Sequence, residues 1–274
     1  MDRARAALLT LLVAVDAVVL FAVPELSAPR ATTVDLTPVA YLREHLGEQR
    51  FATLGPITPN YGSYFGLASF DLHDFPPTLY AQYVHARVDP WAVFTGFRPS
   101  GRPSREWELM HHLAGYRFAG VRYVLTPAGQ PLPDRSPTLR LVFRSPTTRI
   151  YRLAGASPYF GGTGCRVTSG GRDSANVVCP RPTALVRRET WFAGWSAQLD
   201  GHPTAIRRAD GLFQAVAVPA GSHQITFTYV PPGMNWAALG LLGGCALMFA
   251  PTARRLWSSL VRRPAVRSQR VPPA

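Results

Sequence analysis

The chain contains no lysine, so all 29 of its basic side chains are arginine, and they outnumber the 16 acidic residues to give a net charge of +13. A charge of this size often indicates nucleic-acid binding, because basic side chains neutralise phosphate groups. However, the sequence lacks zinc-finger, RNA-recognition and helix-turn-helix spacings, and its arginines lie near the two ends or are scattered. We therefore expect no nucleic-acid partner.

Motifs for catalysis and cofactor binding are also missing. The sequence has no nucleophile elbow and no HExxH pair, and its glycine-rich segment 161–165 does not open a helix as a phosphate cradle does. Asp71, His73 and Asp74 crowd one loop but match no closed zinc site, so we interpret them as hydrogen-bonding loop residues. We predict no metal, no cofactor and no catalytic residue. Whether the chain is an enzyme stays open, with a noncatalytic role favoured.

Two long apolar runs lie near the ends of the chain. Residues 6–23 are interrupted only by Thr10 and Asp16, and as a helix they would span roughly 27 Å. Residues 236–253 form a second run, with Trp236 and Trp257 at positions typical of the membrane interface. Both runs are predicted to be transmembrane helices in a lipid bilayer.

Basic residues flank the outer ends of both runs. Residues 1–5 contain Arg3 and Arg5, and the tail 254–274 begins with two arginines. Because positive flanks stay in the cytoplasm, both termini are predicted to be cytoplasmic and the central domain to lie outside. A cleaved signal peptide is the alternative for residues 6–23, and the central domain is exported in that case too.

Three residues inside the apolar runs predict contacts within the membrane. Asp16 is costly in a bilayer, by about 3 kcal/mol, unless it meets a partner. Gly240 and Gly244 have the small-xxx-small spacing of closely packed helices. We expect these residues to contact an intramembrane partner, and the alternative is that the two helices pack only against each other.

Cysteine is scarce, with three residues in the chain. Cys165 and Cys179 bracket a Gly/Ser-rich stretch that resembles two short strands and a turn. A disulfide between them would persist outside the cytoplasm, while two free thiols are the alternative. Cys245 lies in the second apolar run and is expected to pack as a small apolar residue.

The central part of the chain predicts an α+β fold in two units. Residues 34–127 contain candidate helices at 36–46, 76–86 and 104–116 and candidate strands at 50–54 and 121–126, which indicates a small α/β unit. From residue 138 to 232, short alternating runs predict an antiparallel β-sandwich. Asp200-Gly201 is typical of a tight hairpin turn within it.

A motif near the end of the sandwich resembles a known family. It contains an aromatic-Phe-x-Gly-Trp turn, an Asp-Gly pair, a strand ending in Val-Pro-x-Gly-x-His, and a Pro-Pro pair before an apolar helix. The residues that carry it are Trp191, Phe192, Gly194, Trp195, Asp200, Gly201, Asp210, Phe213, Ala215, Val216, Val218, Pro219, Gly221, His223, Pro231 and Pro232. This pattern resembles the C-terminal extracytoplasmic domain of the YfhO-like family of bacterial membrane proteins.

The resemblance implies a role in bacterial envelope glycosylation. Members of the family look like GT-C glycosyltransferases, which have a many-helix membrane body and use lipid-linked sugars. A chain with two apolar runs has no counterpart of that body. We therefore expect a noncatalytic accessory module in the plasma membrane, paired with a polytopic glycosyltransferase and an envelope glycan. The alternatives are a glycosyltransferase-related enzyme acting alone and a truncated or split remnant of a larger protein.

Five residues of the second unit are candidate glycan contacts. Aromatic rings stack on sugar faces, and polar side chains bind hydroxyl groups. The candidates are Trp191, Trp195, Asp200, His202 and Asp210. The alternative is that both tryptophans close the core of the sandwich.

Overall fold

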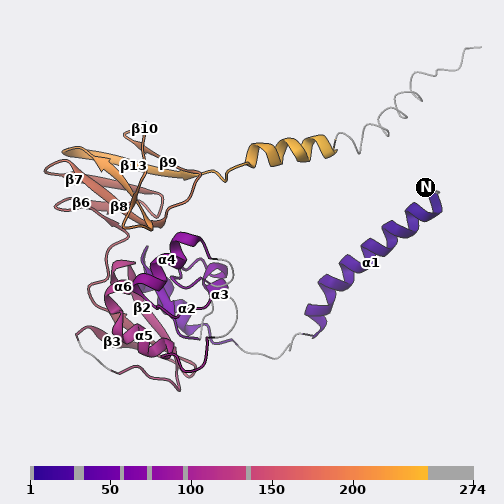
Figure 1. The fold of residues 1–274 in the computed structure, drawn as a ribbon, viewed down its shortest axis with the longest axis horizontal. Helices are drawn as coiled ribbons and strands as arrows, with labels where there is room; N and C mark the ends of the chain where they lie inside the picture. The colour runs from indigo at the N-terminus through magenta and orange to yellow at the C-terminus, as the bar shows by residue number, and fades with distance from the viewer. Residues whose placement is uncertain are drawn as a thin grey trace, which may run out of the picture.

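The computed structural model describes residues 3–27, 34–55, 59–72, 76–94, 98–133 and 137–245. It is an α+β fold in which a mixed sheet with helices is followed by two antiparallel sheets, as Figure 1 shows. We call residues 34–153 the first lobe and residues 158–230 the second lobe. The predicted combination of an α/β unit with antiparallel sheets is confirmed.

The first lobe is built on a four-stranded sheet in the order β1-β2-β4-β3. Strand β1 is parallel to β2, while β4 is antiparallel to both β2 and β3. A parallel pair needs a long crossover, and α3, α4, α5 and α6 lie in the connection from β1 to β2. The elements are α2 (Thr37–His45), β1 (Arg50–Thr53), α3 (Pro59–Tyr64), α4 (Thr78–Arg87), α5 (Arg105–His111), α6 (Leu113–Phe118), β2 (Val121–Pro127), β3 (Leu139–Arg144) and β4 (Thr148–Leu153).

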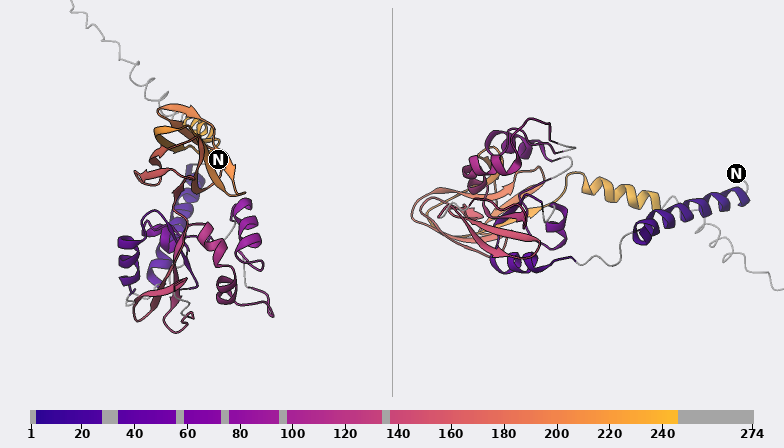
Figure 2. Two further views of the ribbon diagram at one scale, coloured as in Figure 1. Left: turned by 90° about the vertical axis from the view of Figure 1, so that its left-hand side faces the viewer. Right: turned by 90° about the horizontal axis from the view of Figure 1, so that it is seen from below.

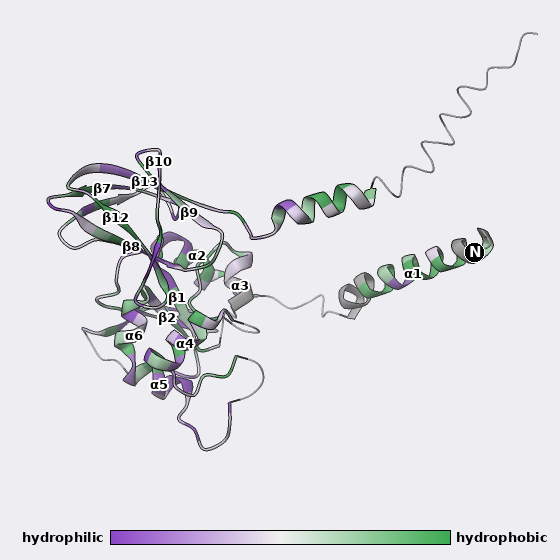
Figure 3. Ribbon diagram, turned by 45° about the horizontal axis from the view of Figure 1, so that its top comes forward, coloured by the Kyte–Doolittle hydropathy of each residue, from purple (hydrophilic) through white to green (hydrophobic). Residues whose placement is uncertain are grey.

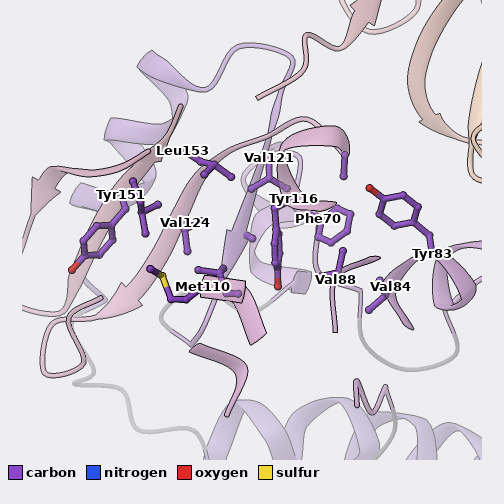
Figure 4. Close-up of a cluster of buried hydrophobic side chains, with 14 of the residues drawn as sticks. Phe70, Tyr83, Val84, Val88, Met110, Tyr116, Val121, Val124, Tyr151 and Leu153 are labelled. Atoms are coloured by element: carbon purple, nitrogen blue, oxygen red, sulfur yellow. The ribbon is translucent and has the colours of Figure 1, made fainter. Parts of the chain in front are cut away.

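Both faces of this sheet are buried. Successive strand residues point to opposite sides, so each strand contributes side chains to two apolar clusters. Val124 and Tyr151 face the helices α4 to α6 in a large apolar cluster, drawn in Figure 4. Leu125 and Ile150 face the other way and pack with Leu42 of α2. The sheet is therefore covered on both sides.

The second lobe consists of two antiparallel sheets, in the orders β10-β9-β13-β7-β6 and β11-β12-β8-β5. Side chains from both sheets form one apolar cluster that includes Val177, Leu185, Val216 and Ile225. Figure 2 shows the two lobes from two further directions. The strands are β5 (Phe160–Gly161), β6 (Arg166–Ser169), β7 (Ser174–Cys179), β8 (Thr183–Thr190), β9 (Trp195–Leu199), β10 (His202–Thr204), β11 (Arg207–Ala209), β12 (Phe213–Val218) and β13 (Gly221–Tyr229).

Two strands belong to a different sheet from the one the sequence indicates. The runs at β3 and β4 were expected to start the sandwich at residue 138, but β4 pairs with β2 and completes the sheet of the first lobe. Alternation of apolar residues identifies a strand without identifying its partner. In the first lobe, β4 can bury both of its faces: Ile150 packs on one side of the sheet and Tyr151 on the other. This burial favours the pairing of β4 with β2.

Two local predictions in the second lobe are confirmed. Leu199 pairs with His202, and both Asp200 and Gly201 have positive φ angles, of 51° and 80°. Glycine and aspartate tolerate this conformation, as a tight hairpin requires. Cys165 and Cys179 form a disulfide, which links the entry to β6 with the end of β7.

The predicted transmembrane segments are not found as membrane-spanning helices. Residues 6–23 lie in the helix α1 (Arg3–Ser27), but within the described ranges no helix is long and apolar enough to cross a bilayer. Residues 234–245 are helical, and the rest of the second run and the tail 254–274 lie outside the described residues. Asp16, Gly240 and Gly244 are exposed, so their contact with a partner stays a prediction.

Candidate functional site

A cavity of about 590 Å³ lies between the two lobes. Phe70 and Tyr80 line it from the first lobe, and Phe192 and Phe213 line it from the second. This volume falls within the range of small-molecule sites, about 300–1,000 Å³. The polar groups of its wall are Arg50, Ser63, Ser69, Asp71, Arg172, Glu189 and Thr190.

Glu189 is the centre of an ionic cluster at this cavity. Its Oε1 accepts hydrogen bonds from Arg50 Nη2 at 3.3 Å and from the backbone N–H of Thr190 at 3.1 Å. Its Oε2 accepts from Arg172 Nη2 at 2.7 Å and from the hydroxyl of Tyr159 at 2.8 Å. Burial alone would raise the pKa of Glu189, but the charges of Arg50 and Arg172 outweigh it and lower the pKa to about 2.

This cluster joins the two lobes. Arg50 stands at the start of β1 in the first lobe, with its guanidinium buried and its Nη1 also donating to the carbonyl of Ala119. Arg172 precedes β7 in the second lobe and donates through Nη1 to the carbonyl of Glu48 at 2.6 Å. The contacts of both arginines therefore cross between the lobes at one wall of the cavity.

Asp71 is the second carboxylate of the cavity wall. Its Oδ2 accepts from the backbone N–H of Thr53 at 2.6 Å, and its Oδ1 accepts from Arg105 Nη2 at 3.2 Å. Asp71 is thus a hydrogen-bonding loop residue, while His73 and Asp74 lie outside the described residues. The part of the chain that the structure describes holds no cluster of three or more His, Cys, Asp or Glu that could bind a metal.

The two candidate tryptophans lie in different surroundings. Trp195 packs against the core of the second lobe, where the Arg187 guanidinium lies 4.1 Å from the centre of its ring. Trp191 donates its backbone N–H to Leu212, and its ring lies 5.8 Å from the Arg208 guanidinium. Neither ring lines the cavity.

Two of the three polar candidates, Asp200 and His202, lie at the far end of β9 from Trp195. Asp200 lies beyond β9 from Trp195, about 16 Å away at the usual rise per strand residue. Its carboxylate binds the backbone N–H of Gln224 at 2.8 Å and lies 2.7 Å from His223 Nδ1. His202 Nδ1 is 3.0 Å from the Asp200 carbonyl. Asp210 stands in the turn between β11 and β12, which Trp191 contacts at Arg208 and Leu212. These five residues therefore form no single site.

No residue that lines the cavity was predicted from the sequence to bind a ligand. Arg50 and Glu189 are 139 positions apart, so no local spacing connects them. Phe192 could have been found, because it lies inside the Trp-Phe-x-Gly-Trp turn. The prediction of glycan contacts instead named the two tryptophans of that turn.

Comparison with known protein families gives a match over the segment that carries Phe192 and Phe213. Residues 192–239 match the model of a family described as "Bacterial membrane protein YfhO". The matched segment runs from the cavity wall through β9 to β13 and into the helix that begins at residue 234. Comparisons with curated proteins and with solved structures found no match.

Proposed function

We propose that this chain is a noncatalytic accessory module of bacterial envelope glycosylation, attached to the plasma membrane and working beside a polytopic partner. The match to a bacterial membrane protein family supports a membrane location. The Cys165–Cys179 disulfide fits a domain outside the cytoplasm, since such bonds persist in oxidising compartments. Both termini would then lie in the cytoplasm, as their arginines indicate.

The observation that carries the noncatalytic role is the state of the carboxylates at the cavity. A general acid needs a proton near neutral pH, but two arginines hold Glu189 ionised, with a pKa of about 2. Its oxygens accept from four donors, which leaves little capacity for a reacting group. Asp71 is likewise bound by Thr53 and Arg105. These contacts favour a binding or positioning role over acid–base chemistry.

Exposed apolar side chains at both ends support attachment to a membrane. Figure 3 shows hydrophobic positions along α1 and along residues 234–245. Large apolar side chains are unusual on the surface of a water-soluble domain unless they contact a partner or a lipid. The most exposed ones include Leu11, Val13, Leu20, Trp236, Leu241 and Leu242.

Photo-crosslinking of the full chain in a bacterium that makes it tests this proposal. A photoreactive residue in place of Leu241 should capture a polytopic membrane protein. The same residue in place of Val178, which is exposed on β7, is the control and should not capture it. Deleting the gene should also remove a glycan modification from the envelope. If neither a polytopic partner nor a change in envelope glycans is found, the proposed function is wrong.

A further inference from the structure

The wall of the cavity between the lobes combines aromatic rings with hydrogen-bonding groups. Phe70 and Tyr80 of the first lobe and Phe192 and Phe213 of the second lobe line it. Pockets of this composition orient a ligand through a few polar contacts while apolar surfaces bury the rest of it. A sugar ring has apolar C–H faces and a hydroxyl edge, so it fits both kinds of wall.

The charged side chains of the wall are already engaged in ion pairs within the protein. Arg50 and Arg172 share Glu189, and Asp71 is paired with Arg105. An anionic ligand would have to compete with Glu189 for the two guanidinium groups, which would separate a partly buried ion pair. A neutral ligand meets no such cost. Each guanidinium also has more N–H groups than these contacts use, and hydroxyl oxygens are suitable acceptors for them.

The cavity lies close in the chain to the start of the C-terminal apolar helix. Gly194, two residues after Phe192, packs against the end of β13, and a Cβ there would lie 2.3 Å from the carbonyl oxygen of Val230. Val230 also donates its backbone N–H to Gly194 at 3.0 Å. The helix begins four residues later, at Met234. The wall that carries Phe192 is therefore fixed to the base of this helix.

We infer that the cavity between the lobes binds a neutral glycosyl unit at the membrane surface, with Phe192 stacking on the sugar ring. This inference rests on the proposed function for the source of the ligand, an envelope glycan or a lipid-linked sugar. The cavity itself predicts the chemistry of the ligand, which is uncharged, rich in hydroxyl groups and apolar on one face.

Saturation-transfer NMR on the full chain in lipid nanodiscs tests the inference. The neutral probes are maltose, gentiobiose, mannobiose and chitobiose, and the anionic probes are glucuronic acid and glucose 1-phosphate. Dodecyl maltoside, compared with maltose, reports whether an attached lipid chain strengthens binding. We expect saturation of at least one neutral disaccharide and none of the anionic probes. Binding of the anionic probes alone, or of no probe, would overturn the inference.

Two substitutions at exposed positions place the binding in the cavity. Phe192→Ala removes the stacking wall and should weaken binding about tenfold, as loss of an aromatic contact typically does. Ser63→Trp should weaken it by filling the cavity from α3. Trp91→Ala is the control, since Trp91 is 39% exposed against 38% for Phe192 and does not line this cavity. Unchanged affinity in both cavity variants would contradict the assignment.

The outcome separates this inference from the proposed function. If a polytopic partner is captured but neutral sugars do not bind, the accessory role stands and the ligand assignment fails. If sugars bind in the cavity but no partner and no envelope phenotype are found, the ligand assignment stands and the accessory role fails.

Discussion

At the scale of single residues, Glu189 is the side chain on which the junction between the lobes depends. Glu189→Gln keeps the shape of the side chain but removes the charge shared by Arg50 and Arg172. Breaking such a pair leaves arginines without compensation. We expect the free energy of unfolding to fall by about 3 kcal/mol, measured by urea unfolding of the full chain in detergent. Glu44→Gln is the control, because 79% of the Glu44 side chain is exposed. Equal stability of the two variants would contradict this role.

The same carboxylate predicts a dependence of stability on pH. Its pKa is about 2 in the folded chain against a reference value of 4.5. Because the folded pKa is the lower one, the stabilisation is complete above about pH 4.5 and is lost as the pH falls towards about 2. The difference in unfolding free energy between wild type and Glu189→Gln should therefore shrink over this window. A difference that stays constant between about pH 7 and about pH 3 would refute the assignment.

Residue-scale features were the hardest to predict from the sequence. Hairpin residues Asp200 and Gly201 were identified because turn chemistry is local. The contact between Arg50 and Glu189 was not, because it joins β1 to β8 across 139 positions. Arg187 shows the same limit. It is 1% exposed and binds Gln214 and Asp173, yet in the sequence it is one arginine among 29.

At the scale of elements, Gly194 fixes the turn before β9 against the end of β13. Its φ angle is +104°, and an added Cβ would meet the Val230 carbonyl oxygen at 2.3 Å. Gly201 is the matched control, with a φ of +80° and nothing within 4 Å of an added Cβ. Gly201→Ala should cost about 1–2 kcal/mol from backbone strain alone. Gly194→Ala should cost clearly more in the same unfolding assay. Equal costs would show that the close approach is unimportant.

The disulfide that closes the hairpin of β6 and β7 predicts which cysteines can be labelled and how much the bond stabilises the fold. When the chain is unfolded in urea without a reductant, an alkylating reagent should label Cys245 alone, and after reduction it should label all three cysteines. Cys165→Ser should lower the free energy of unfolding by about 3 kcal/mol, because the bridge restricts the unfolded chain. Labelling of three cysteines before reduction would show that the bond does not form in the isolated protein.

The elements themselves were largely predictable, while their pairing was not. Apolar alternation and turn residues located most strands of the second lobe and a strand at 121–126, which the structure extends by one residue as β2. The same signals could not show that β4 joins β2 and not β8, because all three have similar patterns. The sheet to which a strand belongs depends on which apolar face it covers, and that is a tertiary property.

At the scale of the whole molecule, the order of the expected elements and the cysteine spacing predicted the α+β class and the Cys165–Cys179 disulfide. These signals could not predict the contacts between the lobes, and therefore could not predict the cavity that lies there. Its aromatic side chains come from α4, from the segment before it, from the connection between β8 and β9, and from β12. A site assembled from such distant segments has no sequence signature of its own.

The last prediction distinguishes an accessory module from an enzyme. In a deletion strain, the double variant Asp200→Asn/Asp210→Asn should restore the envelope glycan as fully as the wild type, because a positioning module needs no acid at these turns. Asparagine tolerates the φ angles of 51° and 50° found there, so the fold should be kept. Phe192→Ala should restore the glycan poorly, and Trp91→Ala fully. Mass spectrometry of the envelope glycans measures all three. Failure of the double variant with normal protein levels would favour an enzyme whose acids lie outside the cavity.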